Sequence, residues 1–202
     1  MNEDIRKPVG RPAQDAALIR AFQEGNKAAF DKLVLNHKDR LFNLCYRLLG
    51  DYEEANDSAQ ETFIKVYRGL KKFRFESGFS TWLYRIAVNT CKNKLKSSAY
   101  RRKSKMVPLD NPVLANRSQP SREIQDESTS PAMELEKKER MRVIQEAIDA
   151  LSPEQKQVVT LRDIEGFSYE EVAEITGFNL GTVKSRIARA RQDLRKKLRS
   201  VI

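Results

Sequence analysis

Basic and aromatic side chains gather in two stretches of this 202-residue chain, in combinations suited to binding nucleic acid. Residues 84–105 carry eight Lys or Arg and no acid, and residues 181–202 carry eight bases against one acid. Seven of the 16 aromatic residues fall within residues 63–84, directly before the first basic stretch. Single-stranded nucleic acid stacks its bases on such rings and places its phosphates beside such cations. The spacing therefore predicts a single-strand site and a second basic surface.

The residues of the single-strand site divide into expected core positions and expected contacts. Helical spacing favours core packing for three aromatics: Phe63, Tyr67 and Trp82. The other rings fall in a segment that resembles a loop and are the better candidates for exposure. Asn89 and Asn93 are one helical turn apart, so they share a face and can hydrogen-bond unstacked bases. The candidate contacts are Phe73, Phe75, Phe79, Asn89, Lys92, Asn93 and Lys96.

Covalent chemistry has little support in the sequence. The only histidine, His37, excludes a H-E-x-x-H zinc site, and the two cysteines form no C-x-x-C pair. Neither a G-x-S-x-G elbow nor a phosphate-binding G-x-x-x-x-G-K-[ST] loop occurs. We therefore expect no enzyme activity, no metal and no cofactor. His37 is expected at a partly buried packing position, and Cys45 and Cys91 are expected in the core.

The local signals are almost all helical, and several polar residues are placed to begin helices. Apolar residues recur at helical spacing from Phe30 to Leu48, and Gly50 ends that run. Ser152 and Ser168 each begin a capping-box pattern, with Gln or Glu three residues later. The other expected caps are Asp15, Asn26, Asp51 and Ser80. These signals predict an all-α protein.

The last two predicted helices form a helix-turn-helix pattern. A short helix over residues 169–176 is followed by a turn at Gly177 and a long basic helix from about Gly181. The second helix of such a unit enters the major groove of DNA, where Arg and Lys read guanine and an alanine methyl suits thymine. Arg186, Arg191 and Arg195 lie at angles better suited to phosphates. The candidate contacts are Thr182, Lys184, Ser185, Arg186, Ala188, Arg189 and Arg191.

Composition along the chain predicts two small helical domains joined by a flexible linker. Residues 97–132 hold four prolines and few apolar residues, so we interpret them as the linker between helical units at 13–96 and 133–202. Residues 1–12 are expected to be a disordered basic arm. The absence of a long apolar run predicts a soluble, cytoplasmic protein. The net charge of +10 is the sum over acidic and basic segments that alternate along the chain. Residues 51–61, for example, carry five acids and no base.

Four segments together resemble the extracytoplasmic-function (ECF) sigma factors of bacterial RNA polymerase, and the sigma-E subgroup in particular. The segments are DYEEANDSAQETFIKVYRGL, FSTWLYRIAVNTCKNKL, LSPEQKQVVTLRDIEGFSYEEVAEITG and GTVKSRIARAR. They occur in the family's order, and the resemblance extends over nearly all of the chain except the first dozen residues and the linker.

The resemblance assigns roles to the segments. It implies that Asp57, Gln60 and Glu61 contact the coiled coil of the polymerase β′ subunit, while Glu53 and Glu54 belong to a solvated helix start. It implies that the segment 73–80 captures a base flipped from the melted minus-ten element, with Asn89 and Asn93 as base contacts. The helix-turn-helix then reads the minus-thirty-five element near the β flap, the linker threads through the polymerase, and an anti-sigma factor regulates the protein.

From the residues alone two rival interpretations stay open. One is a free-standing helix-turn-helix regulator that binds operators without polymerase, which would need neither the aromatic cluster nor the acidic segment. The other is a basic nucleic-acid enzyme, which the missing metal and catalytic spacings oppose. We expect an alternative sigma factor that binds core RNA polymerase and promoter DNA in duplex and single-stranded form.

Overall fold

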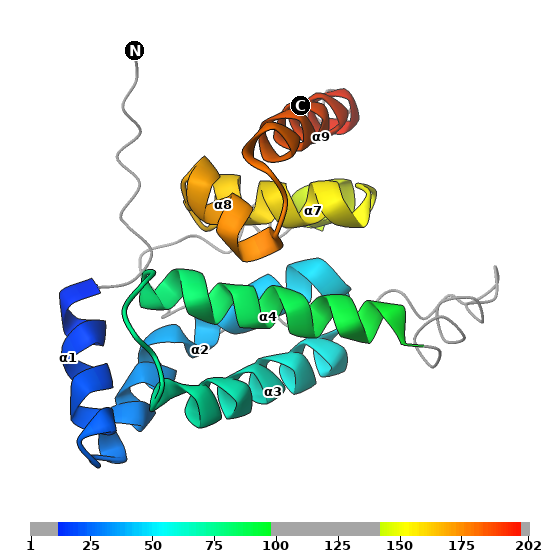
Figure 1. Cartoon of the computed structure of the whole chain (residues 1–202). Helices are drawn as coiled ribbons and strands as arrows, with labels where there is room; N and C mark the ends of the chain where they lie inside the picture. Colours follow the sequence, from blue (N-terminus) through cyan, green and yellow to red (C-terminus); the bar gives the residue numbers. More distant parts are fainter. Residues whose placement is uncertain (1–11, 98–141, 199–202) are drawn as a thin grey trace, which may run out of the picture.

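The computed structural model describes residues 12–97 and 142–198, and every regular element in these two ranges is a helix (Figure 1). The prediction of an all-α fold is confirmed within them. The first range contains α1 (Pro12–Gln23), α2 (Ala28–Leu49), α3 (Tyr52–Leu70) and α4 (Phe79–Lys96). The second contains helical residues 142–149, then α7 (Pro153–Val159), the π-helical turn η2 (Thr160–Ile164), α8 (Tyr169–Thr176) and α9 (Leu180–Leu198). The expected N-terminal arm, and the expected linker beyond residue 97, lie outside the described residues.

The helices are stacked in layers, with α4 in the middle of the molecule (Figure 1). On one side α4 packs against α3, and on the other it packs against α8. The helix α9 covers α7 and α8 from outside. Buried side chains of both described ranges belong to one continuous apolar cluster, which runs from Ile19 of α1 to Ile187 of α9. The two helical units are therefore in direct contact.

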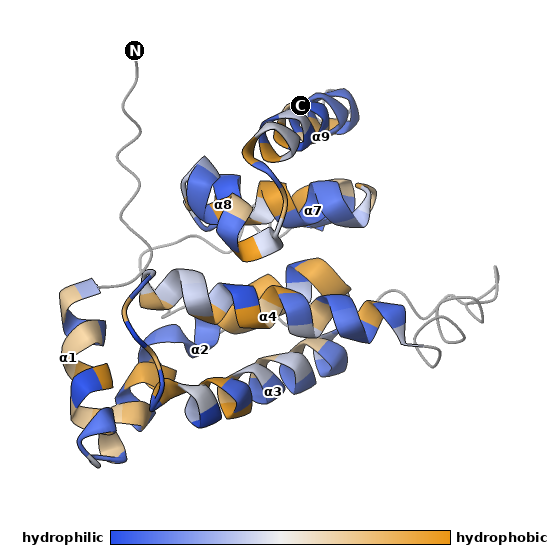
Figure 2. Ribbon diagram, in the orientation of Figure 1, coloured by the Kyte–Doolittle hydropathy of each residue, from blue (hydrophilic) through white to orange (hydrophobic). Residues whose placement is uncertain are grey.

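The helices form where the apolar residues repeat every three or four positions, because that spacing gives each helix one apolar face. On α2 the buried residues include Leu33, Leu41, Leu44 and Cys45. Figure 2 shows the same kind of alternation on α4, where hydrophobic and hydrophilic residues follow each other along the helix. Cys45 of α2 meets Cys91 of α4 inside the core, where both thiols are buried. The hydrogen bond to Cys91, together with burial, raises the pKa of the Cys45 thiol. The expectation that both cysteines are core residues is confirmed.

The helix ends agree with the stronger sequence signals. Ser152 and Ser168 both form complete capping boxes, and Asp51 accepts a hydrogen bond from the backbone N–H of Glu54 at 3.0 Å. Gly50 ends α2 with φ of 74°, a left-handed conformation that glycine adopts without a steric penalty.

Three of the expected caps are wrong. The residue that precedes α2 is Lys27 rather than Asn26, and no side-chain cap bond forms at that position. Ser80 lies inside α4, which begins at Phe79. Asp15 lies inside α1, where it is buried and its Oδ2 atom lies 3.0 Å from Nε2 of His37. A buried carboxylate needs a polar partner, and His37 on α2 supplies one, so the tertiary contact outweighs the local capping signal.

Candidate nucleic-acid and polymerase surfaces

The outer face of α9 carries most of the residues predicted to read duplex DNA. Val183, Ile187 and Ala190 are buried against the rest of the unit. Because these residues turn inward, Lys184, Ser185, Ala188, Arg189 and Arg191 are exposed, and Thr182 and Arg186 are half-buried. Asn179 fixes the start of the helix, since its Oδ1 atom accepts a hydrogen bond of 2.7 Å from the backbone N–H of Thr182. The sequence interpretation missed this cap.

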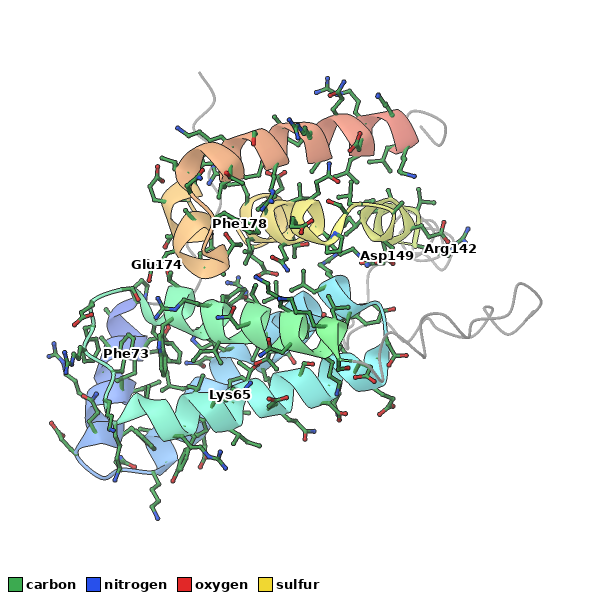
Figure 3. All side chains as sticks on the ribbon, turned by 45° about the vertical axis from the view of Figure 1, so that its right-hand side comes forward. Lys65, Phe73, Arg142, Asp149, Glu174 and Phe178 are labelled. Carbon is green, nitrogen blue, oxygen red and sulfur yellow. The ribbon has the colours of Figure 1, made fainter. Side chains whose placement is uncertain are left out.

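Two arginines of α9 have partners within the protein. The Arg186 guanidinium lies 3.9 Å from the centre of the Phe178 ring, in the turn between α8 and α9 (Figure 3). Arg191 donates to both carboxylate oxygens of Asp163 in η2, with 3.0 Å between Nε and Oδ2. These hydrogen bonds raise the pKa of Arg191. Arg189 carries no such contact among the described residues, so its guanidinium is free to meet a base edge or a phosphate.

The first unit exposes the two predicted base-contacting asparagines. Asn89 and Asn93 are both exposed on α4, one turn apart, as their spacing predicts. Lys92 is half-buried and Lys96 is exposed at the end of the same helix. The second unit packs against the N-terminal half of α4 through Thr81 and Tyr84. The asparagine face is therefore open even while the two units are in contact.

The aromatic residues before α4 are arranged differently from the prediction. Phe73 and Phe79 are only 9% and 8% exposed, so the expectation that they lie free in a loop is wrong. Both rings are buried by a tertiary contact that local spacing does not reveal, because they pack with Trp82 of α4 at centroid distances of 5.0 and 6.2 Å. Phe75 is 40% exposed, which agrees with its prediction.

The expected core aromatics also need one correction. Tyr67 is 42% exposed, although its spacing on α3 predicts burial. Its ring contacts Phe22 of α1 and Phe30 of α2 edge-on, at 5.3 and 5.0 Å between centroids. These contacts lie at the rim of the bundle, where one side of the ring still meets solvent. Phe63 and Trp82 are half-buried against the core.

The acidic residues of α3 form an exposed face with one apolar residue in it. Asp57, Gln60 and Glu61 are exposed, and the next residue on the same face, Ile64, is 52% exposed. Residues three, four and seven positions apart lie along one side of a helix. This side is an anionic surface with an exposed apolar residue at its C-terminal end, which suits a basic partner. Sequence reasoning missed Ile64.

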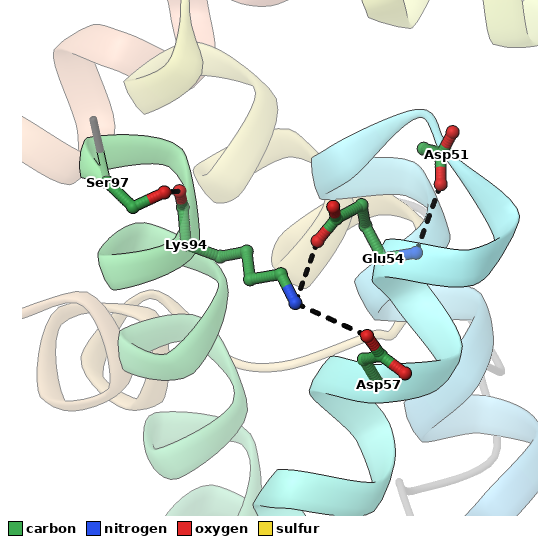
Figure 4. Close-up of polar contacts among 5 residues, drawn as sticks. All are labelled: Asp51, Glu54, Asp57, Lys94 and Ser97. Atoms are coloured by element: carbon green, nitrogen blue, oxygen red, sulfur yellow. Dashed lines mark hydrogen bonds and ion pairs between the residues drawn. The ribbon is translucent and has the colours of Figure 1, made fainter. Parts of the chain in front are cut away.

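Lys94 of α4 joins this acidic surface to the helix that carries the asparagines. Its Nζ atom lies 2.8 Å from Glu54 Oε2 and 3.5 Å from Asp57 Oδ2 (Figure 4). The hydrogen bond to Glu54 raises the pKa of Lys94, so the cation persists beyond the usual pH range. Glu54 is therefore more than part of a solvated helix start. It fixes α4 on α3, beside Asp57 of the candidate polymerase surface.

A polar seam joins the two units and was not predicted. The Tyr84 hydroxyl donates to Glu165 Oε2 at 2.8 Å, and the Tyr84 ring meets Phe167 edge-on at 4.8 Å. Arg85 of α4 faces Glu174 of α8 at 3.5 Å (Figure 3). Burial raises the pKa of Glu165, against the smaller effects of Tyr84, Arg40 and Arg47.

No metal site is evident in the described residues, because no three His, Cys, Asp or Glu side chains converge there. His37 is buried and paired with Asp15 rather than placed as a ligand. In the same part of the chain, no helix has the length and apolar character to cross a membrane.

Comparison with known proteins identifies the family. Residues 33–102 match the family described as Sigma-70 region 2, and residues 141–194 match Sigma-70, region 4. The chain is 38% identical over 189 residues to the RNA polymerase sigma-H factor of Pseudomonas aeruginosa, covering 94% of this chain and 96% of that protein. It is also 38% identical over 191 residues to the ECF RNA polymerase sigma-E factor of Haemophilus influenzae, covering 93% and 97% of the two chains. The chain belongs to the ECF sigma factor family.

The fold of this ECF sigma factor is shared with solved structures. The sigma factor RpoE of Bartonella quintana, in complex with the anti-sigma factor NepR, matches with a TM-score of 0.62 and 25% identity. The match covers 84% of this chain and 96% of that one. The family consists of transcription initiation factors, so the alternative of a free-standing helix-turn-helix regulator is not supported. The resemblance found in the sequence is confirmed.

Proposed function

We propose that this ECF sigma factor directs core RNA polymerase to promoters by holding a melted minus-ten strand and a duplex minus-thirty-five element at separate surfaces. The observation that carries the proposal is the exposure of both surfaces in one chain. Asn89, Asn93 and Phe75 offer hydrogen bonds and a ring for unstacked bases on the first unit. Arg189 and its neighbours on α9 offer the contacts that duplex major grooves require.

The roles divide between the units at the boundaries that the sequence suggests. Residues 13–96 serve as sigma region 2, and residues 133–202 serve as region 4. The segment 97–132 links them, and residues 1–12 form a separate basic arm. The protein catalyses no covalent step. It binds open promoter DNA more tightly than closed promoter DNA, and that differential affinity shifts the equilibrium toward the open form.

Opening the promoter requires that bases leave the stack, which costs a few kcal/mol for each flipped base. Stacking on an aromatic ring returns about 1–3 kcal/mol for each base. Hydrogen bonds from the Asn89 and Asn93 amides add to the stacking energy only when the base edges are free of their Watson–Crick partners. The two asparagines therefore favour the melted strand over the duplex.

The partners of the protein follow from its charged surfaces. Asp57, Gln60 and Glu61 on α3 contact the coiled coil of the polymerase β′ subunit, and the region 4 unit lies at the β flap. An anti-sigma factor binds the protein and holds it inactive. A complex of this kind has been solved for the Bartonella quintana sigma factor RpoE with the anti-sigma factor NepR. Action with polymerase on chromosomal DNA places the protein in the cytoplasm.

Run-off transcription tests the proposal. Core polymerase with this protein is expected to give promoter-specific transcripts on a template selected by the holoenzyme from random DNA, and core polymerase alone is expected to give none. Equal specific transcription by core polymerase alone would refute the proposal.

Asn89→Ala separates melting from duplex binding. The variant is expected to lose permanganate reactivity of thymines in the minus-ten region, while footprinting of the minus-thirty-five element stays at the wild-type level. Wild-type permanganate reactivity in this variant would refute the role of Asn89 in holding the melted strand.

A further inference from the structure

The helix α1 contacts the segment between α3 and α4, although it lies outside residues 33–102, where the chain matches sigma region 2. The Gln23 side chain of α1 donates from Nε2 to the carbonyl oxygens of Leu70 and Phe73, at 3.1 and 2.9 Å. These bonds hold the end of α3 and the start of the following segment. In Figures 1 and 3 this segment runs beside α1, with Phe73 between the two. The segment is therefore held in one shape by α1.

Phe75 has an unusual backbone conformation in the middle of this segment. Its φ is 59°, and it is the only non-glycine residue with positive φ in the described part of the chain. A bulky residue adopts this left-handed conformation at an energetic cost, and such conformations cluster at functional sites. Beneath it, the Phe73 ring meets the Phe75 ring edge-on at 5.0 Å. The ring is thereby supported from below and presented to solvent.

Arg20 of α1 supplies a cation next to this ring. Its guanidinium carbon lies 5.6 Å from the centre of the Phe75 ring, and the side chain is exposed. Among the described residues, no carboxylate lies within ion-pair distance of Arg20. An arginine without an acidic partner beside an exposed ring has both donors and charge available for a phosphate.

The charges around the pair favour an anionic ligand. Lys71, Lys72 and Arg74 are exposed in the same segment. Glu76 is the nearest acid in sequence, and it lies 3.9 Å from the Arg74 guanidinium, which partly offsets its charge. Glu24 follows Arg20 by one turn of α1 and is exposed without pairing with it. The net charge of this group is positive.

We propose that Arg20 and Phe75 together form a subsite for one nucleotide of melted DNA, with the base on the Phe75 ring and the adjoining phosphate on Arg20. This inference rests on the proposed function, because it concerns the strand that region 2 holds open. It assigns to α1 a direct contact with DNA. The Gln23 hydrogen bonds position the segment, and the left-handed backbone of Phe75 presents the ring.

The test uses holoenzyme assembled from the full chain and fork-junction promoter DNA, with 2-aminopurine placed at each unpaired position in turn. Phe75→Gly removes the ring and keeps the backbone free to adopt positive φ. We expect it to abolish fluorescence quenching at one position and to weaken fork binding by about tenfold or more. Phe75→Tyr retains a ring and is expected to keep both signals.

Arg20→Ala is expected to weaken fork binding by about 3–10-fold and to lower the salt slope by about one. Arg20→Lys keeps the charge and is expected to keep the slope. Lys32→Ala removes an exposed cation of α2 and is the control for net charge.

An effect of Arg20→Ala no larger than that of Lys32→Ala, or an equal loss on fully duplex promoter DNA, would overturn the proposal. So would undiminished quenching in Phe75→Gly. If the wild-type holoenzyme gave no promoter-specific transcript, that result would instead refute the proposed function itself.

Discussion

Gly69 near the end of α3 determines where the indole of Trp82 can lie. A Cβ atom at this position would be 3.1 Å from Cζ2 and 3.2 Å from Cη2 of that ring. The Trp82 ring in turn contacts Phe73 and Phe79, and Phe73 packs against the exposed Phe75. The absence of a side chain at Gly69 therefore allows the aromatic cluster to close against α3.

Gly69→Ala is expected to lower the free energy of unfolding by about 1 kcal/mol. Overpacking costs about 1–3 kcal/mol, and the better helix propensity of alanine returns no more than ~1 kcal/mol. Urea denaturation gives the energy. Emission from Trp82, the only tryptophan in the chain, is expected to shift toward longer wavelength.

Gly181→Ala is the matched control for this substitution. Its Cβ atom would lie 3.6 Å from Asn179 Oδ1, an ordinary contact, so the same change in α9 is expected to leave stability unchanged or raise it. A stabilised Gly69→Ala variant with wild-type emission would show that the indole does not constrain this position.

At the level of elements, the Glu171 carboxylate of α8 makes two contacts. It completes the N-terminal cap of α8, and it also contacts α4 of the first unit. Glu171 Oε2 accepts from the backbone N–H of Ser168 at 2.8 Å, which completes the capping box. Glu171 Oε1 accepts from the Thr81 hydroxyl of α4 at 3.4 Å. The start of the helix-turn-helix and the seam between the units are therefore coupled.

Ser168→Ala is expected to destabilise the protein by about 1 kcal/mol and also to weaken the packing of α8 on α4. Ser152→Ala removes the same type of box from α7, which makes no such contact through its Gln155, and serves as the control. Both variants should lose similar stability in urea. Hydrogen exchange of α4 amides should increase only in Ser168→Ala, and equal exchange in the two variants would contradict the coupling.

The π-helical turn η2 places the residues of the seam. The Glu165 N–H bonds to the Thr160 carbonyl five residues earlier, at 2.9 Å. This wider turn ends the helix next to Glu165 and Phe167, which meet Tyr84 on α4. Sequence signals predict one helix closed by Gly166 and do not distinguish an α-turn from a π-turn. Turns of this kind are frequent at functional sites.

At the scale of the whole molecule, the docked arrangement and promoter binding require different distances between the units. The helix α9 is separated from α4 by two layers of helix packing, or roughly 20 Å at 8–10 Å for each layer. Elements near minus-ten and minus-thirty-five are about 25 base pairs apart, or roughly 85 Å at 3.4 Å per pair. The seam between the units must therefore open when the protein engages a promoter.

The buried Glu165 makes this opening dependent on pH. Its pKa is raised in the docked state by burial and returns toward its ordinary value when the units separate. The docked state thus binds more protons, so docking is favoured at low pH and weakens as the pH rises from the ordinary value of a glutamate through the raised one. Energy transfer between dyes on α3 and α9, followed from pH 5 to 8, is expected to fall as the pH rises.

Glu165→Gln tests the assignment of this pH dependence. The amide can still accept from the Tyr84 hydroxyl, and it carries no charge to bury. Energy transfer in this variant is expected to stay high at every pH. A pH profile unchanged from the wild type would assign the transition to other groups.

Much of this protein was predictable from local sequence. The capping boxes at Ser152 and Ser168, the left-handed Gly50 and Gly177, and the inward stripe of α9 all depend on residues within one or two turns of each other. The faces that expose Asn89, Asn93 and Arg189 follow from the same periodicity. Four family segments in order then identified the sigma factor, because those motifs are themselves local.

Tertiary structure alone decided which aromatic rings are exposed and which charges are paired. Phe73 and Phe75 are two residues apart in one basic segment, yet the first is buried by Trp82 and Phe79 and the second meets solvent. Glu54 and Lys94, or Tyr84 and Glu165, are separated by many residues and come together only when helices pack. Exposure and pairing depend on what lies opposite a side chain in space, and the spacing of residues along one helix carries no information about that partner.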